Sequence, residues 1–298
     1  MIPPRTILAP IDFSEASRAS LQCAARLAGQ WNAALHVLHV LDPLLATAAQ
    51  TRHIDLVSGT RDELDTFCRD AGLDSRVVPT LHVVVGAAAE AICEAASAHH
   101  ADLIVAGSRG LSGLNRLMMG TTIEHVIRRT HTSVLTVPGR CPGDDVTEWG
   151  PVIAAIDDPS HPETLAGPAA ALAGSLAAPL HLVHVVPPLP ALARWRAEAE
   201  EVRDARVDAA QRTLTTAISG LRKIEPSNVH VVCGTVGDTL AAEAGRHTRT
   251  LPILLLGRAA PGRGPAPGSV ASRIIARATA AVWVYLPDAD GVRQASRL

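Results

Sequence analysis

The second half of this 298-residue chain repeats the first half. A shift of 145 positions aligns three blocks without a gap: Ile11-Asp12 with Ile156-Asp157, Leu27-Ala28-Gly29 with Leu172-Ala173-Gly174, and Leu35-His36 with Leu180-His181. Farther along, His82-Val83-Val84 returns as His230-Val231-Val232, and residues 103–107 match residues 253–257. A period this long is typical of a duplicated domain and not of a solenoid, so the sequence predicts two copies of one fold.

Each copy alternates predicted strands with predicted helices. In the first copy, apolar runs typical of buried strands cover residues 6–11, 35–41, 77–85, 103–106 and 133–137. Helices are expected over residues 14–29, 54–71, 87–99 and 122–129, and Ser14 is the expected cap of the first. The stretch that begins at Asp42 is polar and less patterned. This alternation predicts an α/β fold: two tandem doubly wound domains, each a five-stranded parallel sheet flanked by helices.

The boundary between the copies is marked by turn-forming residues. Pro142 and Gly143 stand among aspartates between the last strand of the first copy and the first strand of the second. We therefore expect one domain over residues 1–140, a linker over 141–149 and a second domain over 150–290.

Composition excludes several classes of protein. The net charge is −2 and aromatic residues make up 2% of the chain, so the broad basic surface and the stacking platforms of nucleic-acid binders are not expected. No apolar run approaches the roughly 20 residues of a membrane span, and the N-terminus leads directly into a strand, leaving no room for a signal peptide. Five scattered cysteines without Cys-x-x-Cys spacing are typical of reduced thiols, so a cytoplasmic location is expected.

A glycine-rich segment, residues 107–121, joins the fourth predicted strand to a helix in the first copy. Its sequence is Gly-Ser-Arg-Gly-Leu-Ser-Gly-Leu-Asn-Arg-Leu-Met-Met-Gly-Thr, and Thr121 is the expected N-cap of the helix. Gly107, Gly110 and Gly120 would permit positive φ and close approach of backbone N–H groups, and the helix N-terminus favours an anion. The segment therefore predicts a phosphate site; the alternative is a surface loop that needs glycines only to turn.

Two common nucleotide motifs do not fit. A P-loop needs a lysine after its last glycine, but the only lysine is Lys223, and a dinucleotide fingerprint should follow the first strand, which ends without glycine at Asp12. The spacing Gly, two residues, Gly, nine residues, Gly-Thr resembles the ATP-binding signature of universal stress proteins. The segments 7–14, 38–42, 101–107 and 133–138 resemble that family too, and the resemblance covers nearly the whole chain as a tandem protein.

The resemblance implies a Rossmann-like fold, of the adenine nucleotide α-hydrolase-like type, that binds ATP. It makes Asp12 a ribose contact, and it places the backbone near Pro10, Ile11 and Val40 around the adenine. The alternative for Asp12 is a cap on the following helix. The phosphates would lie against the loop and helix start, with these candidates: Gly107, Ser108, Arg109, Gly110, Gly120, Thr121 and Thr122. Arginines of the loop suit bidentate phosphate contacts, although a solvated position is equally compatible with the sequence.

The second copy departs from this pattern. Ala260 replaces the second glycine, the loop between Gly257 and Gly268 is two residues shorter, and three prolines remove N–H donors. Asp157 keeps its residue type, and Ser269 follows the last glycine; whether this copy binds nucleotide stays open. Pro168 is expected to interrupt its first helix, and a long charged helix is expected over residues 191–222.

Two His-x-x-His pairs, His36/His39 and His181/His184, invite a metal hypothesis. Residues three apart in a strand point to opposite faces, so one ion cannot collect both rings of a pair. No protein metal site is predicted, and any Mg²⁺ or Mn²⁺ would arrive with the phosphates.

The sequence thus favours an ATP-binding, nucleotide-responsive regulator of stress survival or growth. A slow ATP hydrolase or nucleotidyl-transfer enzyme on the same fold is the alternative, and a purely structural dimerisation protein is a third hypothesis. The catalytic signature Gly-x-Ser-x-Gly is absent and no general base stands beside the loop, so no catalytic residues are assigned. The end strands, residues 134–137 and 282–285, are expected to pair as an intramolecular pseudo-dimer, which could associate further into a homodimer.

Overall fold

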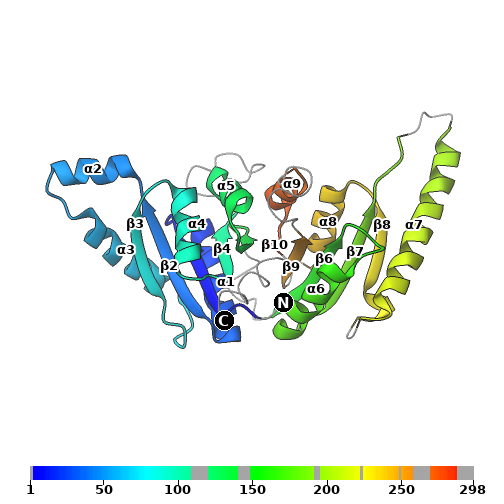
Figure 1. Cartoon of the computed structure of the whole chain (residues 1–298), viewed down its shortest axis with the longest axis horizontal. Helices are drawn as coiled ribbons and strands as arrows, with labels where there is room; N and C mark the ends of the chain where they lie inside the picture. Colours follow the sequence, from blue (N-terminus) through cyan, green and yellow to red (C-terminus); the bar gives the residue numbers. More distant parts are fainter. Residues whose placement is uncertain are drawn as a thin grey trace. The chain divides into compact units, whose positions relative to one another are not determined.

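The computed structural model describes residues 3–108, 120–139, 148–190, 195–221, 224–247, 250–257 and 269–286. The chain divides into two compact units, the first formed mainly before residue 142 and the second mainly after it. Each unit is an α/β domain with a parallel sheet flanked by helices (Figure 1). The predicted fold class is confirmed.

The first domain contains five strands and five helices within the described residues. In chain order these are β1 (Thr6–Pro10), α1 (Glu15–Trp31), β2 (Ala34–Leu41), α2 (Pro43–Thr51), α3 (Leu56–Asp70), β3 (Thr80–Val85), α4 (Ala88–Ala98), β4 (Leu103–Gly107), α5 (Thr121–Arg129) and β5 (Ser133–Val137). The strands pair in parallel in the order β3-β2-β1-β4-β5, so the winding direction reverses between β1 and β4. Reversal of this kind puts helices on both faces of the sheet.

Two pairs of helices cover this sheet. Helices α4 and α5 pack against each other in front of the strands in Figure 1. On α1, Gln22 donates from Nε2 to the carbonyl of Ala71, just after α3, at 3.0 Å. Phe13 and Phe67 meet edge to face with 5.5 Å between ring centroids, which also joins the start of α1 to α3. The fully buried aliphatic side chains of β1, β2 and β4 form the core between these layers.

Helix α2 is not predicted from the sequence, where the stretch after Asp42 is less patterned. Asp42 caps it, accepting from the N–H of Leu44 at 2.7 Å, and Pro43 occupies the first turn, where its missing N–H costs nothing. Only Ala49 of this helix is buried, so the sequence carries no apolar stripe that would reveal it. The third strand also begins later than expected, at Thr80, because Val77 turns back to bond the carbonyl of Asp74 at 2.8 Å.

The second domain has the same topology. Its elements are β6 (Trp149–Ile156), α6 (Glu163–Leu176), β7 (Leu180–Val186), α7 (Arg196–Ile218), a 3₁₀ turn (Pro226–Asn228), β8 (Val229–Cys233), α8 (Val236–Gly245), β9 (Leu251–Gly257), α9 (Ser269–Arg277) and β10 (Ala281–Tyr285). Its strand order is β8-β7-β6-β9-β10, which repeats the order of the first domain. The repeat in the sequence is therefore a repeat of topology.

Pro168 does not interrupt helix α6, contrary to the sequence-based expectation. The helix runs through it from Glu163 to Leu176. The carbonyl deprived of its donor belongs to Thr164, one turn earlier on an exposed side of the helix, where water can replace the missing bond. The expected long helix is present as α7, over a shorter range than predicted.

Within the described residues, no helix is both long enough and apolar enough to cross a bilayer. Cys23, Cys68, Cys93 and Cys233 are not paired with one another. Burial raises the pKa of the Cys68 thiol to about 11, with a smaller contribution from Asp65, so this thiol stays protonated at neutral pH.

We predict that Asp42→Ala loosens helix α2 without affecting the rest of the first domain. Loss of an N-cap costs about 1 kcal/mol, and α2 is held by few buried contacts, so its amides should exchange about fivefold faster. Hydrogen exchange followed by mass spectrometry over residues 43–51 measures this effect. Asp62→Ala, at an exposed position inside α3, is the control; equal exchange of residues 43–51 in both variants would refute the capping role.

Candidate functional site

A cavity of about 280 Å³ opens at the carboxyl edge of the first sheet. It lies where the strand order reverses between β1 and β4, which is the place where open α/β sheets bind ligands. Its lining comes from β1, β2, β4 and the starts of α1, α4 and α5: Pro10, Ile11, Asp12, Ser17, Leu38, His39, Val40, Ala88, Ile92, Ala106, Gly107, Gly120, Thr121, Thr122 and Ile123. Eight residues of the predicted nucleotide site are among them.

The floor of this cavity is fixed by hydrogen bonds at the end of β1. The N–H of Ile11 donates to the carbonyl of Leu38 at 2.8 Å, and Nδ1 of His39 bonds the carbonyl of Ile11 at 2.8 Å. Both backbone groups of Ile11 are therefore engaged. His184 makes the same contact with the carbonyl of Ile156 in the second domain, at 2.9 Å.

Val40 lies two residues beyond Leu38, the last residue of β2 that pairs with β1. The carbonyl of Leu38 points toward β1, where it accepts from Ile11. Backbone groups two residues apart in a strand point in the same direction, so the N–H and carbonyl of Val40 also point toward the β1 side. The last β1 residue in the ladder is Pro10, opposite Leu38, so the backbone of Val40 borders the cavity beyond the end of β1.

Asp12 stands at the rim of the cavity and organises the start of α1. Its Oδ1 accepts from the N–H of Ser14 at 3.1 Å and from the Ser14 hydroxyl at 2.6 Å. Ser14 is the N-cap, accepting from the N–H of Ser17 at 3.1 Å, as the sequence predicted. Asp12 is thus not the cap itself but the group that holds the cap in place.

Gly107 is required for close approach, and the prediction that it permits positive φ is wrong. Among the described glycines only Gly72 has a positive φ. A Cβ on Gly107 would lie 2.9 Å from the carbonyl carbon and oxygen of Ala16, in the first turn of α1. The end of β4 therefore packs directly against the helix backbone, and no side chain fits between them.

Gly120, and not Thr121, is the N-cap of α5. Gly120 has an ordinary φ of −61°, its carbonyl accepts from the N–H of Glu124 at 3.1 Å, and no side chain caps the helix. Thr121 is consequently the first helical residue. The N–H groups of Thr121, Thr122 and Ile123 are in the first turn, where the helix itself provides no acceptor, and all three residues line the cavity.

The remaining loop candidates do not line the cavity or lie outside the described residues. Ser108 is buried; its N–H donates to the carbonyl of Val137 at 2.9 Å, and its own carbonyl accepts from the N–H of Gly120 at 3.1 Å. Arg109 and Gly110 belong to residues 109–119, which are outside the described part of the chain.

An ion pair joins the two helices whose N-termini border the cavity. Arg129 of α5 bonds Glu90 of α4, and the pKa of Glu90 is lowered, first by a backbone hydrogen bond and then by Arg129. The second domain repeats this pair with Arg277 of α9 and Asp238 of α8. There the pKa of the carboxyl is lowered first by the hydroxyl of Thr235, at 2.8 Å, and then by the arginine.

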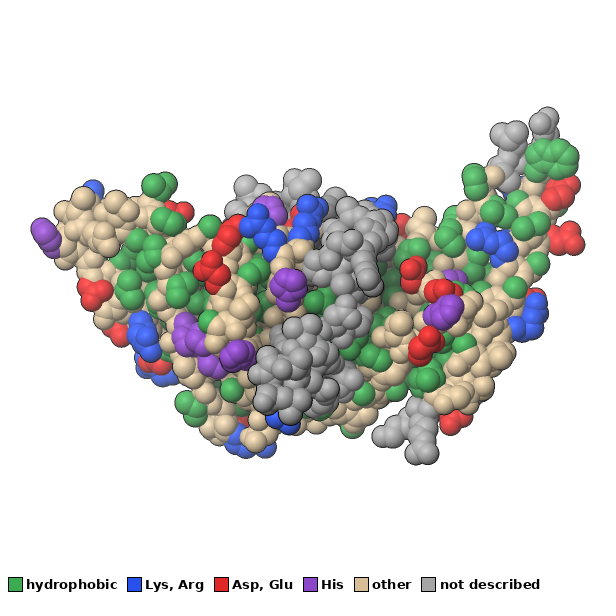
Figure 2. Space-filling view, viewed as in Figure 1, with side chains coloured by type: hydrophobic (Ala, Val, Ile, Leu, Met, Phe, Trp, Pro, Cys, Tyr) green, Lys and Arg blue, Asp and Glu red, His purple; other side chains and the backbone are tan. Residues whose placement is uncertain are grey.

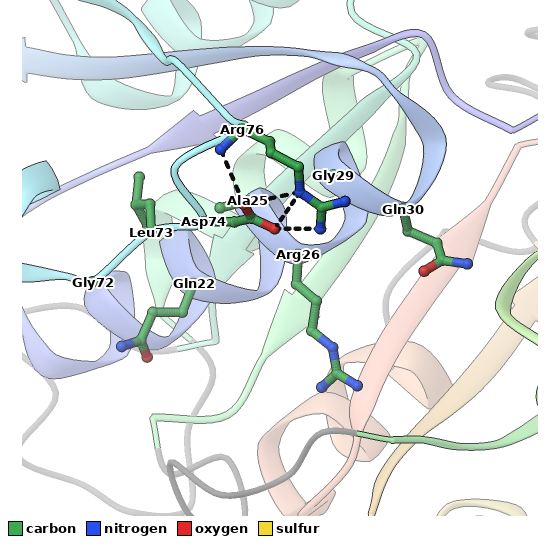
Figure 3. Close-up of a pocket in the computed structure, with 9 residues that line it drawn as sticks. All are labelled: Gln22, Ala25, Arg26, Gly29, Gln30, Gly72, Leu73, Asp74 and Arg76. Atoms are coloured by element: carbon green, nitrogen blue, oxygen red, sulfur yellow. Dashed lines mark hydrogen bonds and ion pairs between the residues drawn. The ribbon is translucent and has the colours of Figure 1, made fainter.

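A second cavity, of about 440 Å³, lies beside the C-terminal half of α1 and is a poorer candidate for an anion. Gln22, Arg26 and Gln30 project from the helix, and Arg76 is turned onto Asp74 with 2.6 Å between Nη2 and Oδ2 (Figure 3). Hydrogen bonds from that guanidinium lower the pKa of Asp74 to about 2, so the two charges offset each other. The negative end of the α1 dipole also faces this side.

In the second domain, the counterparts of Asp12 and Gly107 are more exposed. Asp157 and Gly257 are both exposed, and a Cβ on Gly257 would meet only Leu165, whose Cδ1 is 3.8 Å away. Ser269 begins α9, while Ala260 and Gly268 are not among the described residues. The close approach seen at Gly107 is therefore not repeated at Gly257.

The histidines of each His-x-x-His pair separate, as strand geometry predicts. His39 bonds the Ile11 carbonyl, whereas Nδ1 of His36 lies 2.9 Å from Nε2 of His82. His99 completes a group of three with the last two. Spacing within one strand does not predict this group. The signal in the sequence is that His82 and His99 return in the second half as His230 and His247.

Comparison with known proteins agrees with the fold. A model of the Universal stress protein family matches residues 4–138 and 148–285. Universal stress protein MJ0531 of Methanocaldococcus jannaschii is 26% identical over 146 residues, which are 45% of this chain and 81% of that protein. Universal stress protein YxiE of Bacillus subtilis is 29% identical over 143 residues, 44% of this chain and 97% of that protein.

A solved structure supports the fold over the whole length. The functionally unknown protein PA1789 from Pseudomonas aeruginosa PAO1 is 19% identical, with 99% of this chain and 98% of that chain covered and a TM-score of 0.64. The structural similarity is evidence for the fold. At this low sequence identity it carries no information on a ligand.

We predict that Gly107→Ala destabilises the first domain by about 1–3 kcal/mol, because the new Cβ would overlap the backbone of Ala16. The matched variant Gly257→Ala should change the second domain by less than about 0.5 kcal/mol, since its Cβ has room. Hydrogen exchange of the slowest amides in each sheet measures both free energies of opening. Similar losses in the two domains would contradict the close approach.

Proposed function

Because the chain belongs to the universal stress protein family, we propose that its first domain binds an adenine nucleotide, ATP, and that the protein is a nucleotide-responsive regulator of stress survival or growth. The observation that carries this proposal is the cavity between the end of β1 and the N-terminus of α5. Its volume of about 280 Å³ is near the lower limit of small-molecule sites, which suits a base and ribose whose phosphates extend outward.

The base is assigned to the part of the cavity next to β2. The polar backbone groups of Ile11 are engaged with Leu38 and His39, so the hydrogen-bonding edge of adenine is assigned to the backbone of Val40. An N–H donor and a carbonyl acceptor on one residue complement the acceptor N1 and the donor N6 of adenine. Ile92 and Leu38 supply apolar surface for the faces of the ring.

The ribose and phosphates are assigned to the opposite side. The carboxylate of Asp12, held by Ser14, is a fixed acceptor for ribose hydroxyls. The first-turn N–H groups of α5 and its positive dipole end favour the phosphates. Gly107 and Gly120 keep this path free of side chains, and a divalent cation would be carried by the phosphates themselves.

The second domain is assigned weak or no binding. Its loop has lost a glycine and two residues, and three prolines have removed N–H donors. Asp157 keeps the residue type but is exposed, whereas Asp12 lines the cavity of the first domain. We infer that nucleotide occupancy of the first domain is the variable to which the protein responds.

We predict that Asp12→Ala weakens ATP binding by about 10- to 100-fold, because a charged hydrogen-bond acceptor contributes roughly 1.5–3 kcal/mol. Gly120→Ala should also weaken binding, since its methyl group would stand at the start of α5. Calorimetric titration with ATP and Mg²⁺ measures both effects. Asp157→Ala is the matched control and should bind as the unaltered protein does; wild-type affinity in Asp12→Ala and Gly120→Ala would overturn the site assignment.

We predict ATP turnover far below the roughly 1–10³ s⁻¹ of typical enzymes. Among the described residues, the two titratable side chains that line the cavity both have structural partners: Asp12 holds Ser14, and His39 holds the Ile11 carbonyl. A general base needs a free position beside the reacting atoms. Phosphate release from a purified sample checks this; several turnovers per second that vanish in Asp12→Asn would favour the enzyme hypothesis.

A further inference from the structure

Three histidines gather at the amino-terminal half of β2 and β3, below the C-terminal end of α4. The three are His36, His82 and His99. Each has one ring nitrogen that lies within 4.8 Å of a ring nitrogen of both others. Histidine side chains are visible together on the face of the first domain that carries α4 (Figure 2). We propose that this trio binds a divalent first-row transition metal, and that Zn²⁺ suits it best.

The fold brings the three rings together from three elements. In the parallel pairing of β2 with β3, Leu38 is opposite His82, so His36 and His82 are diagonal neighbours on the same face of the sheet. His99 is the C-cap of α4, a helix that packs on β2 and delivers the third ring from above. Ligands from two strands and a helix are fixed by the tertiary structure and not by local sequence.

The distance between the first two ring nitrogens is close to that in a tetrahedral zinc site. Nδ1 of His36 and Nε2 of His82 are 2.9 Å apart and share a hydrogen bond. Two nitrogens bound to one zinc ion at about 2.0–2.1 Å are separated by about 3.4 Å, so this pair has to open by only about 0.5 Å. The rings of His36 and His99 are stacked, with 4.8 Å between centroids, and must tilt to converge; rotation of an imidazole about χ2 meets a low barrier.

The trio is accessible to a further ligand. All three side chains are half-buried, so water can reach the fourth coordination position.

The same arrangement recurs in the second domain. Nδ1 of His181 lies 3.0 Å from Nε2 of His230, and Val183 is opposite His230 in the β7–β8 register as Leu38 is opposite His82. The third ring, His247, is farther away, with 5.7 Å between its centroid and that of His181. The two domains differ in their glycine loops but share this trio, so the trio does not depend on an intact nucleotide loop.

A purely structural role is the alternative: a hydrogen-bonded pair of imidazoles stacked under a helix end. Arg61 of α3 also acts on His82, and its positive charge opposes a bound cation. The two roles predict different results. A purely structural trio would not bind Zn²⁺, whereas a metal site should bind Zn²⁺ more tightly when the guanidinium of Arg61 is removed.

The test uses untagged full-length protein, stripped of metal with a chelator and free of nucleotide. Zn²⁺ is titrated by calorimetry, and Co²⁺ is titrated by visible absorption, which reports tetrahedral nitrogen ligation. We expect one tight Zn²⁺ site. His99→Asn should weaken it by about 100-fold or more, since loss of even an outer-shell partner of a ligand costs 10- to 100-fold. His247→Asn, the equivalent change in the second domain, is the matched control and should leave the tight site unchanged.

Arg61→Gln keeps all three imidazoles and should tighten Zn²⁺ binding. Circular dichroism of each variant confirms that the fold persists, and His36→Gln serves if His99→Asn does not fold. The proposal is overturned if no tight Zn²⁺ site is found, if His99→Asn binds Zn²⁺ as the unaltered protein does, or if His247→Asn removes the same site.

Discussion

The close contact between the end of β4 and the first turn of α1 supports the whole candidate site. Gly107 lies against the backbone of Ala16, where a single methyl group would meet atoms at 2.9 Å. From this point Ser108 turns inward to bond Val137, and Gly120 returns to bond Ser108. Ser108 and Gly120 are therefore joined directly, and the N-terminus of α5 is fixed beside the end of β4.

Much of the fold could be predicted because parallel strands that are buried on both faces have continuous apolar sequences. Helix α2 could not, since only Ala49 is buried and its one clear signal is the cap Asp42 next to Pro43. The candidate site residues were predicted from the resemblance, and the conformational roles expected of Gly107 and Thr121 were wrong. A glycine required for close approach, such as Gly107, looks in the sequence like one required for positive φ. A threonine after a glycine looks like a cap even where the glycine takes that position.

The histidine trio could not be predicted from the sequence for a different reason. Alternation along a strand correctly separates His36 from His39, because it is a property of one strand. The meeting of His36 with His82 depends on the register between two strands, and the approach of His99 depends on where α4 ends. Neither can be read from periodicity. Comparison of the two halves would have helped, because three histidines return together while the glycine loop does not.

Helix α4 connects these two regions of the first domain. Ala88 and Ile92, in its first half, line the cavity, and His99 ends it at the trio, about 16 Å farther along the axis. An α-helix of this length moves as a stiff rod. If an ion draws His99 toward the strands, the helix start shifts with it, and the two sites share one coupling free energy. Thermodynamic linkage then requires reciprocity: the factor by which zinc alters nucleotide affinity is the factor by which nucleotide alters zinc affinity.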